Sequence, residues 1–248
     1  PSIVAMLVGA LYNIVDQFFI GQKIGELGNA ATNVAFPLST ICTAFALLFG
    51  IGGAAAFNLT MGEGNRKKAV YYIGNSISIL FILGMLLAIL TQLFLVPMLK
   101  FFGSPDNVLN YASVYTRITS IGFPFLVFSI GSGHLIRADG KPKYAMLCNL
   151  SGAIINTILD PIFIFGLNMD MAGAALATVI GQIASFYLAV RYFRRYKTLP
   201  LTKQHLIPRW VSSSKIIALG AAPAFNQTAM MVVQITMNKS LTHYGALS

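Results

Sequence analysis

The chain has 248 residues, of which 56% are hydrophobic and 10% charged, and its mean hydropathy is +0.72. Soluble domains carry about 25% charged residues, so this composition excludes a soluble globular protein and indicates an all-α polytopic membrane protein. The net charge of +10 does not indicate a nucleic-acid partner, because the basic residues cluster between apolar runs and no nucleic-acid-binding motif is present.

A membrane-spanning helix needs about 20 mostly apolar residues. Seven segments meet this condition, and we predict helices at 1–21, 34–57, 73–99, 113–136, 144–166, 171–192 and 214–238. Most connections are short, which makes successive helices antiparallel neighbours.

The longest connection is basic and contains Pro200 and Pro208, so it predicts a domain boundary. We expect a six-helix lobe at 1–193, a cytoplasmic inter-lobe connection at 194–213, and the first helix of a second lobe at 214–248. This layout fits transporters built from internal repeats. The chain opens on Pro1 without an initiator Met, and we expect a fragment that lacks the rest of the C-terminal lobe.

The basic residues predict the orientation in the membrane. The connections after the second, fourth and sixth predicted helices carry 13 Lys and Arg residues, whereas those after the first, third and fifth carry only Lys23 and Lys100. Positive residues concentrate on the cytoplasmic side. We therefore predict a multi-pass protein of the cytoplasmic (inner) membrane with a cytoplasmic N-terminus.

Two acidic residues, Asp16 and Asp160, fall inside predicted membrane helices. An ionisable group at that depth costs about 2.5–3.5 kcal/mol on insertion scales, so it normally faces an interior cavity and has a function. At 1.5 Å per residue, Asp16 lies about 8–10 Å, Asp160 about 9 Å and Thr178 about 10 Å below the outer face. Three helices therefore present polar groups in one layer.

Each aspartate also has polar company at helical spacing. Asn156 precedes Asp160 by four residues, and Tyr12 precedes Asp16 by four, so each pair shares a helix face. Pro161 follows Asp160 directly and cannot donate a backbone hydrogen bond, which predicts a kink and a hinge at this point.

This cluster predicts a cation site rather than an enzyme active site. Two nearby carboxyl groups can share a proton. Together with an amide oxygen, a hydroxyl and a freed carbonyl, they also form an oxygen shell for a small hard cation. The residues do not choose between H⁺ and Na⁺. We expect no other metal and no cofactor, because the three histidines share no ligand spacing.

Several sequence motifs resemble the multidrug and toxic compound extrusion (MATE) family of transporters. They are Tyr12-Asn13-Ile14-Val15-Asp16, Phe18-Phe19-Ile20-Gly21, Met61-Gly62-Glu63-Gly64-Asn65, Arg137-Ala138-Asp139-Gly140-Lys141-Pro142, Asn156-Thr157-Ile158-Leu159-Asp160-Pro161-Ile162-Phe163 and Gly173-Ala174-Ala175-Leu176-Ala177-Thr178. Together they span the chain. The resemblance implies twelve helices in two six-helix lobes.

It also implies cation-coupled export of amphipathic, often cationic organic compounds across the lipid bilayer by alternating access. The cation site that the resemblance implies for the first lobe consists of Asp16, Asn156, Asp160 and Thr178, with Tyr12 beside them. One feature departs from some branches of the family, because no acidic residue occurs between Ile216 and Ser248.

Two alternatives remain open. A lipid or lipid-linked oligosaccharide flippase of related architecture would need basic residues inside the lobe to bind pyrophosphate, and only Arg117 is a candidate. An intramembrane aspartyl protease would need Asp16 and Asp160 within hydrogen-bonding reach and a flexible glycine motif at the second aspartate, where this chain has Pro161.

Overall fold

The computed structural model describes residues 14–196 and 201–245, and over these residues it is helical with no strand. An N-terminal helix is described from residue 14 to residue 24. The elements that follow it are α2 (Glu26–Gly62), α3 (Arg66–Leu93), α4 (Leu95–Phe101), α5 (Asp106–Ile121), α6 (Phe123–Ala138), α7 (Pro142–Pro161), the π-helix η1 (Ile162–Gly166), α8 (Asp170–Arg194), the 3₁₀-helix η2 (Lys203–Leu206) and α9 (Trp210–Gly245).

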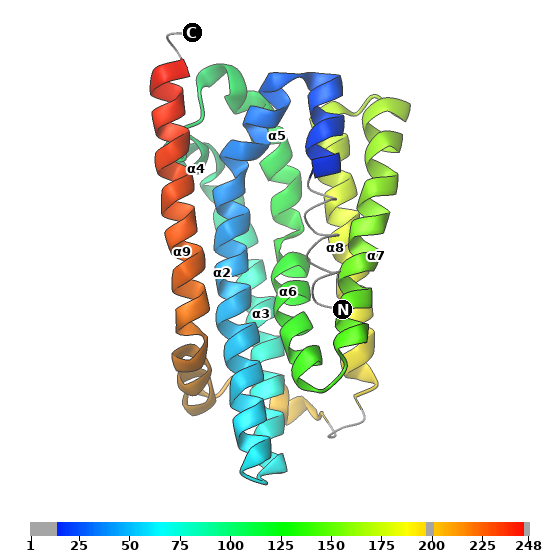
Figure 1. Ribbon diagram of the computed structural model, residues 1–248, viewed down its shortest axis with the longest axis vertical. Helices are drawn as coiled ribbons and strands as arrows, with labels where there is room; N and C mark the ends of the chain where they lie inside the picture. Colours follow the sequence, from blue (N-terminus) through cyan, green and yellow to red (C-terminus); the bar gives the residue numbers. More distant parts are fainter. Residues whose placement is uncertain (1–13, 197–200, 246–248) are drawn as a thin grey trace.

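The all-α membrane fold predicted from composition is confirmed. Within the described residues, five helices are long and apolar enough to cross a membrane, and α5 with α6 forms a sixth candidate if this bent pair is one span. The helices run roughly parallel to the long axis of the molecule (Figure 1). Large apolar side chains such as Met85, Ile89 and Leu93 lie exposed along α3, as expected for a surface that faces lipid.

Two predicted helices are not continuous, and these predictions were wrong in detail. The segment 113–136 belongs to α5 and α6, which meet at Gly122 with a bend of 57°. Pro124 lies in the first turn of α6, where its missing N–H requires no helical partner. The segment 73–99 is broken at Phe94, between α3 and α4. Hydropathy alone cannot detect such breaks, because both halves are apolar.

The connections separate by charge as the sequence predicts. In Figure 1 the turns after α2 and α6, and η2 after α8, lie at the lower end, whereas the turns after the N-terminal helix, α4 and η1 lie at the upper end. The basic clusters that begin at Arg66 and Arg137 therefore share one end of the molecule.

The long helix α2 is central to the packing, and its contact with α9 depends on glycine. A Cβ atom at Gly52 would overlap the carbonyl oxygen of Ile216, and one at Gly220 would overlap that of Leu48. The two backbones are therefore closer than any other residue would allow, which is a common device between membrane helices.

The connection between α8 and α9 is anchored to α3. The ring of His205 packs edge-on against Tyr71, at 4.5 Å between centroids. The backbone N–H of Arg209 donates to the side-chain oxygen of Asn75 at 3.0 Å. These contacts fix where α9 starts, four residues before the predicted beginning of this helix at residue 214.

Candidate functional site

Asn156 and Asp160 lie one turn apart on α7 and both point into the protein, where they are 3% and 0% exposed. The Asn156 side-chain amide donates to Asp160 Oδ1 at 3.3 Å and to Thr178 Oγ1 of α8 at 3.4 Å. Thr178 in turn donates to the carbonyl oxygen of Ala174 at 3.0 Å. One amide therefore connects the carboxyl group of α7 to the hydroxyl group of α8.

Asp16 reaches the same place from the N-terminal helix. Its side chain is 6% exposed, and the carboxyl groups of Asp16 and Asp160 interact through a side-chain hydrogen bond. A hydrogen bond between two carboxyl groups needs a proton on one of them. The structure therefore brings together Asp16, Asn156, Asp160 and Thr178 from three helices. Tyr12, the fifth predicted residue, lies outside the described residues.

Three oxygen atoms in this cluster have no hydrogen-bond partner among the described residues. They are Oδ1 of Asp16, Oδ1 of Asn156 and Oδ2 of Asp160, and each is buried. Buried oxygen atoms are nearly always satisfied by a hydrogen bond or an ion. Carboxylate and amide oxygens are the ligands that hard cations prefer. Within the described part of the chain, no group of three or more His, Cys, Asp and Glu residues could hold a metal ion.

The spacing of α7 and α8 at this site is set by two glycines one turn from the polar residues. A Cβ atom on Gly181 would lie 2.6 Å from the Gly152 carbonyl oxygen and 3.2 Å from Asn156 Cβ. The helices can touch here only because neither position has a side chain.

The helix geometry changes directly after Asp160. The α-helix α7 ends at Pro161 and continues as the π-helix η1. The wider turns of a π-helix are frequent at functional sites, and they accommodate the hydrogen bond that proline cannot make. Pro161 therefore lies at a change of helix type, beside the buried carboxyl group. Its role as a hinge stays a prediction.

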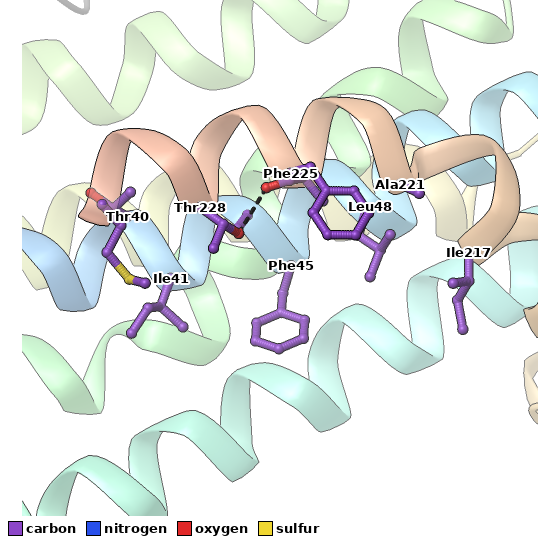
Figure 2. Close-up of a pocket in the computed structure, with 11 residues that line it drawn as sticks. Thr40, Ile41, Phe45, Leu48, Ile217, Ala221, Phe225 and Thr228 are labelled. Carbon is purple, nitrogen blue, oxygen red and sulfur yellow. Dashed lines mark hydrogen bonds between the residues drawn. The ribbon is translucent and has the colours of Figure 1, made fainter. Parts of the chain in front are cut away.

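A second feature of interest is an apolar pocket of about 400 Å³ between α2 and α9. Figure 2 shows Phe45 and Leu48 of α2 lining it together with Ile217 and Phe225 of α9. Two threonines also line it, but Thr228 donates its hydroxyl to the carbonyl oxygen of Ala224. The pocket therefore offers an almost wholly apolar surface, which suits the apolar part of an amphipathic molecule.

The sequence analysis missed the partners of Asp139, which it assigned to a loop. The hydroxyl groups of Tyr192 and Tyr196 on α8 and its C-terminal end both donate to this carboxylate, Tyr196 at 3.1 Å. The four-residue spacing of the two tyrosines was the available signal, since it places both rings on one helix face.

Comparison with known proteins places this geometry in a family. The MatE family model matches residues 1–162, which is more than half of the chain. The chain belongs to the MatE family. Its fold and the resemblance seen in its motifs are thereby confirmed. Proteins of this family are transporters and not enzymes, which excludes the protease alternative even though Asp16 and Asp160 lie within hydrogen-bonding reach.

Relatives of this MatE chain are named for drug export. The multidrug export protein MepA of Staphylococcus haemolyticus is 32% identical over 247 residues, which cover 99% of this chain and 54% of MepA. The probable multidrug resistance protein YoeA of Bacillus subtilis is 25% identical, with 99% of this chain and 55% of YoeA covered. The chain thus spans about half the length of the curated relatives it matches.

Solved structures agree with this assignment. The MATE multidrug transporter DinF-BH, determined in complex with a small-molecule ligand, has a TM-score of 0.92 and 31% identity, over 99% of this chain and 55% of that one. An inward-facing MATE transporter of the MOP superfamily has a TM-score of 0.84 over 92% of this chain and 52% of its own, and its 24% identity supports the fold alone.

Proposed function

We propose that the protein is a cation-coupled multidrug efflux antiporter, of which this chain forms the first lobe (1–193), the inter-lobe connection (194–213) and the start of the second lobe (214–248). It exports amphipathic, often cationic organic compounds in exchange for H⁺ or Na⁺. It lies in the cytoplasmic membrane with its N-terminus and its basic connections inside the cell. The names of its relatives and the ligand complex of a similar multidrug transporter support this substrate class.

The observation that carries the proposal is the direct meeting of Asp16 and Asp160 across two helices. With one proton between them, or one cation bound to both, the two carboxyl groups attract and hold the N-terminal helix against α7. With neither, two negative charges repel in a medium of low dielectric constant. The occupancy of the site therefore decides whether the N-terminal helix is docked.

This dependence couples the ion to the transport cycle. A docked and an undocked N-terminal helix give the lobe two shapes, and the coupling ion binds one of them more tightly. Asn156 and Thr178 extend the response to α8, and Pro161 with η1 supplies the joint in α7. The apolar pocket between α2 and α9 receives the apolar part of the exported compound.

A flippase for lipid-linked substrates is the alternative, and it has less support. It needs positive side chains inside the lobe, whereas the buried ionisable residues of the candidate site are acidic. Arg117, the candidate named from the sequence, is exposed on α5.

The proposal is tested with the full-length protein in everted membrane vesicles, by following uptake of a fluorescent lipophilic cation. A proton gradient and a sodium gradient are imposed in turn on wild type, Asp160→Asn and Asp106→Asn. Asp106 is an exposed acidic residue in the first turn of α5, so its variant is the matched control. We expect Asp160→Asn to lose gradient-driven transport and Asp106→Asn to keep it.

The gradient that drives wild-type transport names the coupling ion. Normal transport by Asp160→Asn would refute coupling at this site. A wild type that responds to neither gradient would favour the flippase.

A further inference from the structure

The end of the α7–α8 hairpin carries an excess of positive charge. Between residues 137 and 196 the chain has three acidic residues, and two of them, Asp160 and Asp170, lie toward the opposite end of the hairpin. The same segment has six basic residues, which lie at the end of α6, in the turn before α7, at the start of α7 or at the end of α8: Arg137, Lys141, Lys143, Arg191, Arg194 and Arg195. The remaining acid, Asp139, lies among them.

Asp139 is engaged by tyrosines. It accepts hydrogen bonds from the hydroxyl groups of Tyr192 and Tyr196, which fix the last turn of α8 against the turn that precedes α7. A third tyrosine, Tyr144 of α7, donates to the carbonyl oxygen of Leu188 at 3.0 Å. These bonds hold the two helices in register and position the neighbouring arginines.

Three shallow pockets of about 400 to 540 Å³ adjoin one another on this surface. Arg191 and Arg195 line two of them together, and Tyr144 and Leu147 line the third as well as the middle one. Since Arg191 and Arg195 are four residues apart at the end of α8, both guanidinium groups project from the same helix face. We call this surface the α7–α8 basic groove, defined by Lys141, Lys143, Tyr144, Leu147, Arg191 and Arg195.

Beyond the cations the surface turns apolar. Leu147, Ile154 and Ile158 of α7 are 50%, 53% and 55% exposed, and Ile183 and Tyr187 of α8 are 41% and 62% exposed. These positions follow the two helices away from the basic end toward the middle of the membrane span. A molecule bound to the groove therefore meets positive charge at one end and an apolar track along the rest.

We propose that the α7–α8 basic groove binds the headgroup of an anionic phospholipid, with the acyl chains along the exposed apolar residues of α7 and α8. The guanidinium groups of Arg191 and Arg195 present paired donors that match the oxygen atoms of a phosphodiester. Lys141 and Lys143 add charge at the headgroup, and basic pockets between membrane helices are suited to such lipids. This site is separate from the buried acidic cluster and independent of the proposed coupling.

The test measures lipid binding to the purified full-length protein in neutral detergent by native mass spectrometry, with phosphatidylglycerol and phosphatidylcholine as probes. We expect phosphatidylglycerol to bind at least about tenfold more tightly, and Arg191→Gln/Arg195→Gln to weaken it by about tenfold or more. Lys67→Gln/Lys68→Gln, which removes two exposed charges from the same end at the start of α3, is the matched control and leaves binding unchanged.

A further variant, Arg191→Lys/Arg195→Lys, keeps the charges and separates loss of folding from loss of the site. We expect intermediate binding, because lysine contacts phosphate as a point charge without the planar pair of donors. Equal losses in the two Gln variants would overturn the proposal in favour of a general electrostatic effect. Equal binding of both lipids, or displacement of phosphatidylglycerol by excess inorganic phosphate, would also overturn it, and the latter would indicate a site for free phosphate.

Discussion

The glycine contact between α7 and α8 allows a prediction that leaves every polar group of the candidate site intact. In Gly181→Ala the new Cβ atom would lie 2.6 Å from the Gly152 carbonyl oxygen, where ordinary contacts begin near 3.4 Å. That oxygen belongs to the backbone and cannot rotate away, so the helices must separate by about 0.8 Å. Overpacking of this kind costs about 1–3 kcal/mol.

The same displacement reaches the site. The bond from the Asn156 amide to Thr178 Oγ1 is already 3.4 Å long, and a separation of this size breaks it, because hydrogen bonds weaken beyond about 3.2 Å. We expect Gly181→Ala to lower the apparent melting temperature of the full-length protein and to weaken gradient-driven efflux.

The matched control is Gly133→Ala in α6. This glycine is buried and helical, yet a Cβ atom there would meet no atom within 4 Å. The substitution is expected to be neutral or slightly stabilising, because it lowers the conformational entropy of the unfolded chain. The reasoning fails if Gly181→Ala melts and transports like Gly133→Ala.

Two shorter predictions concern packing elsewhere. Gly220→Ala places a Cβ atom against a backbone carbonyl of α2, so it should separate α2 from α9 and lower the melting temperature by more than Gly133→Ala does; equal melting temperatures would contradict the close contact. Tyr192→Phe removes a hydrogen bond to the Asp139 carboxylate, which we expect to destabilise the protein by about 1.5–3 kcal/mol. Tyr187→Phe, at an exposed position of the same helix, is its control in thermal unfolding, and similar losses would argue against the bond.

Much of the fold was predictable, because the membrane requires long apolar helices and leaves few alternatives. Hydropathy located the spans and the basic residues ordered the connections. It did not find the bend between α5 and α6 at Gly122 or the break at Phe94. Hydrophobic runs report whether a segment is buried in lipid, whereas a bend depends on a local backbone bond and on the helix that packs beside it.

The candidate site was predictable to the level of depth and helix face. Counting residues from the helix ends placed Asp16, Asp160 and Thr178 in one layer, and the four-residue spacing put Asn156 on the face of Asp160. It could not show that the two carboxyl groups touch, because the rotation of each helix about its axis is set by packing. That rotation depends on contacts such as Gly152 with Gly181, which a single sequence does not pair.

The cost of an unsatisfied polar group explains why depth predicted one cluster and missed another. At the middle of the membrane span Asp16 and Asp160 have no water to bind, so an isolated carboxyl group there is expensive, and each must find a partner at its own depth. Asp139 lies at the end of the span, where solvent is an alternative partner. Its sequence position therefore demands no protein contact, and its tyrosines could be found only by asking which residues one helical turn apart face the same turn of chain.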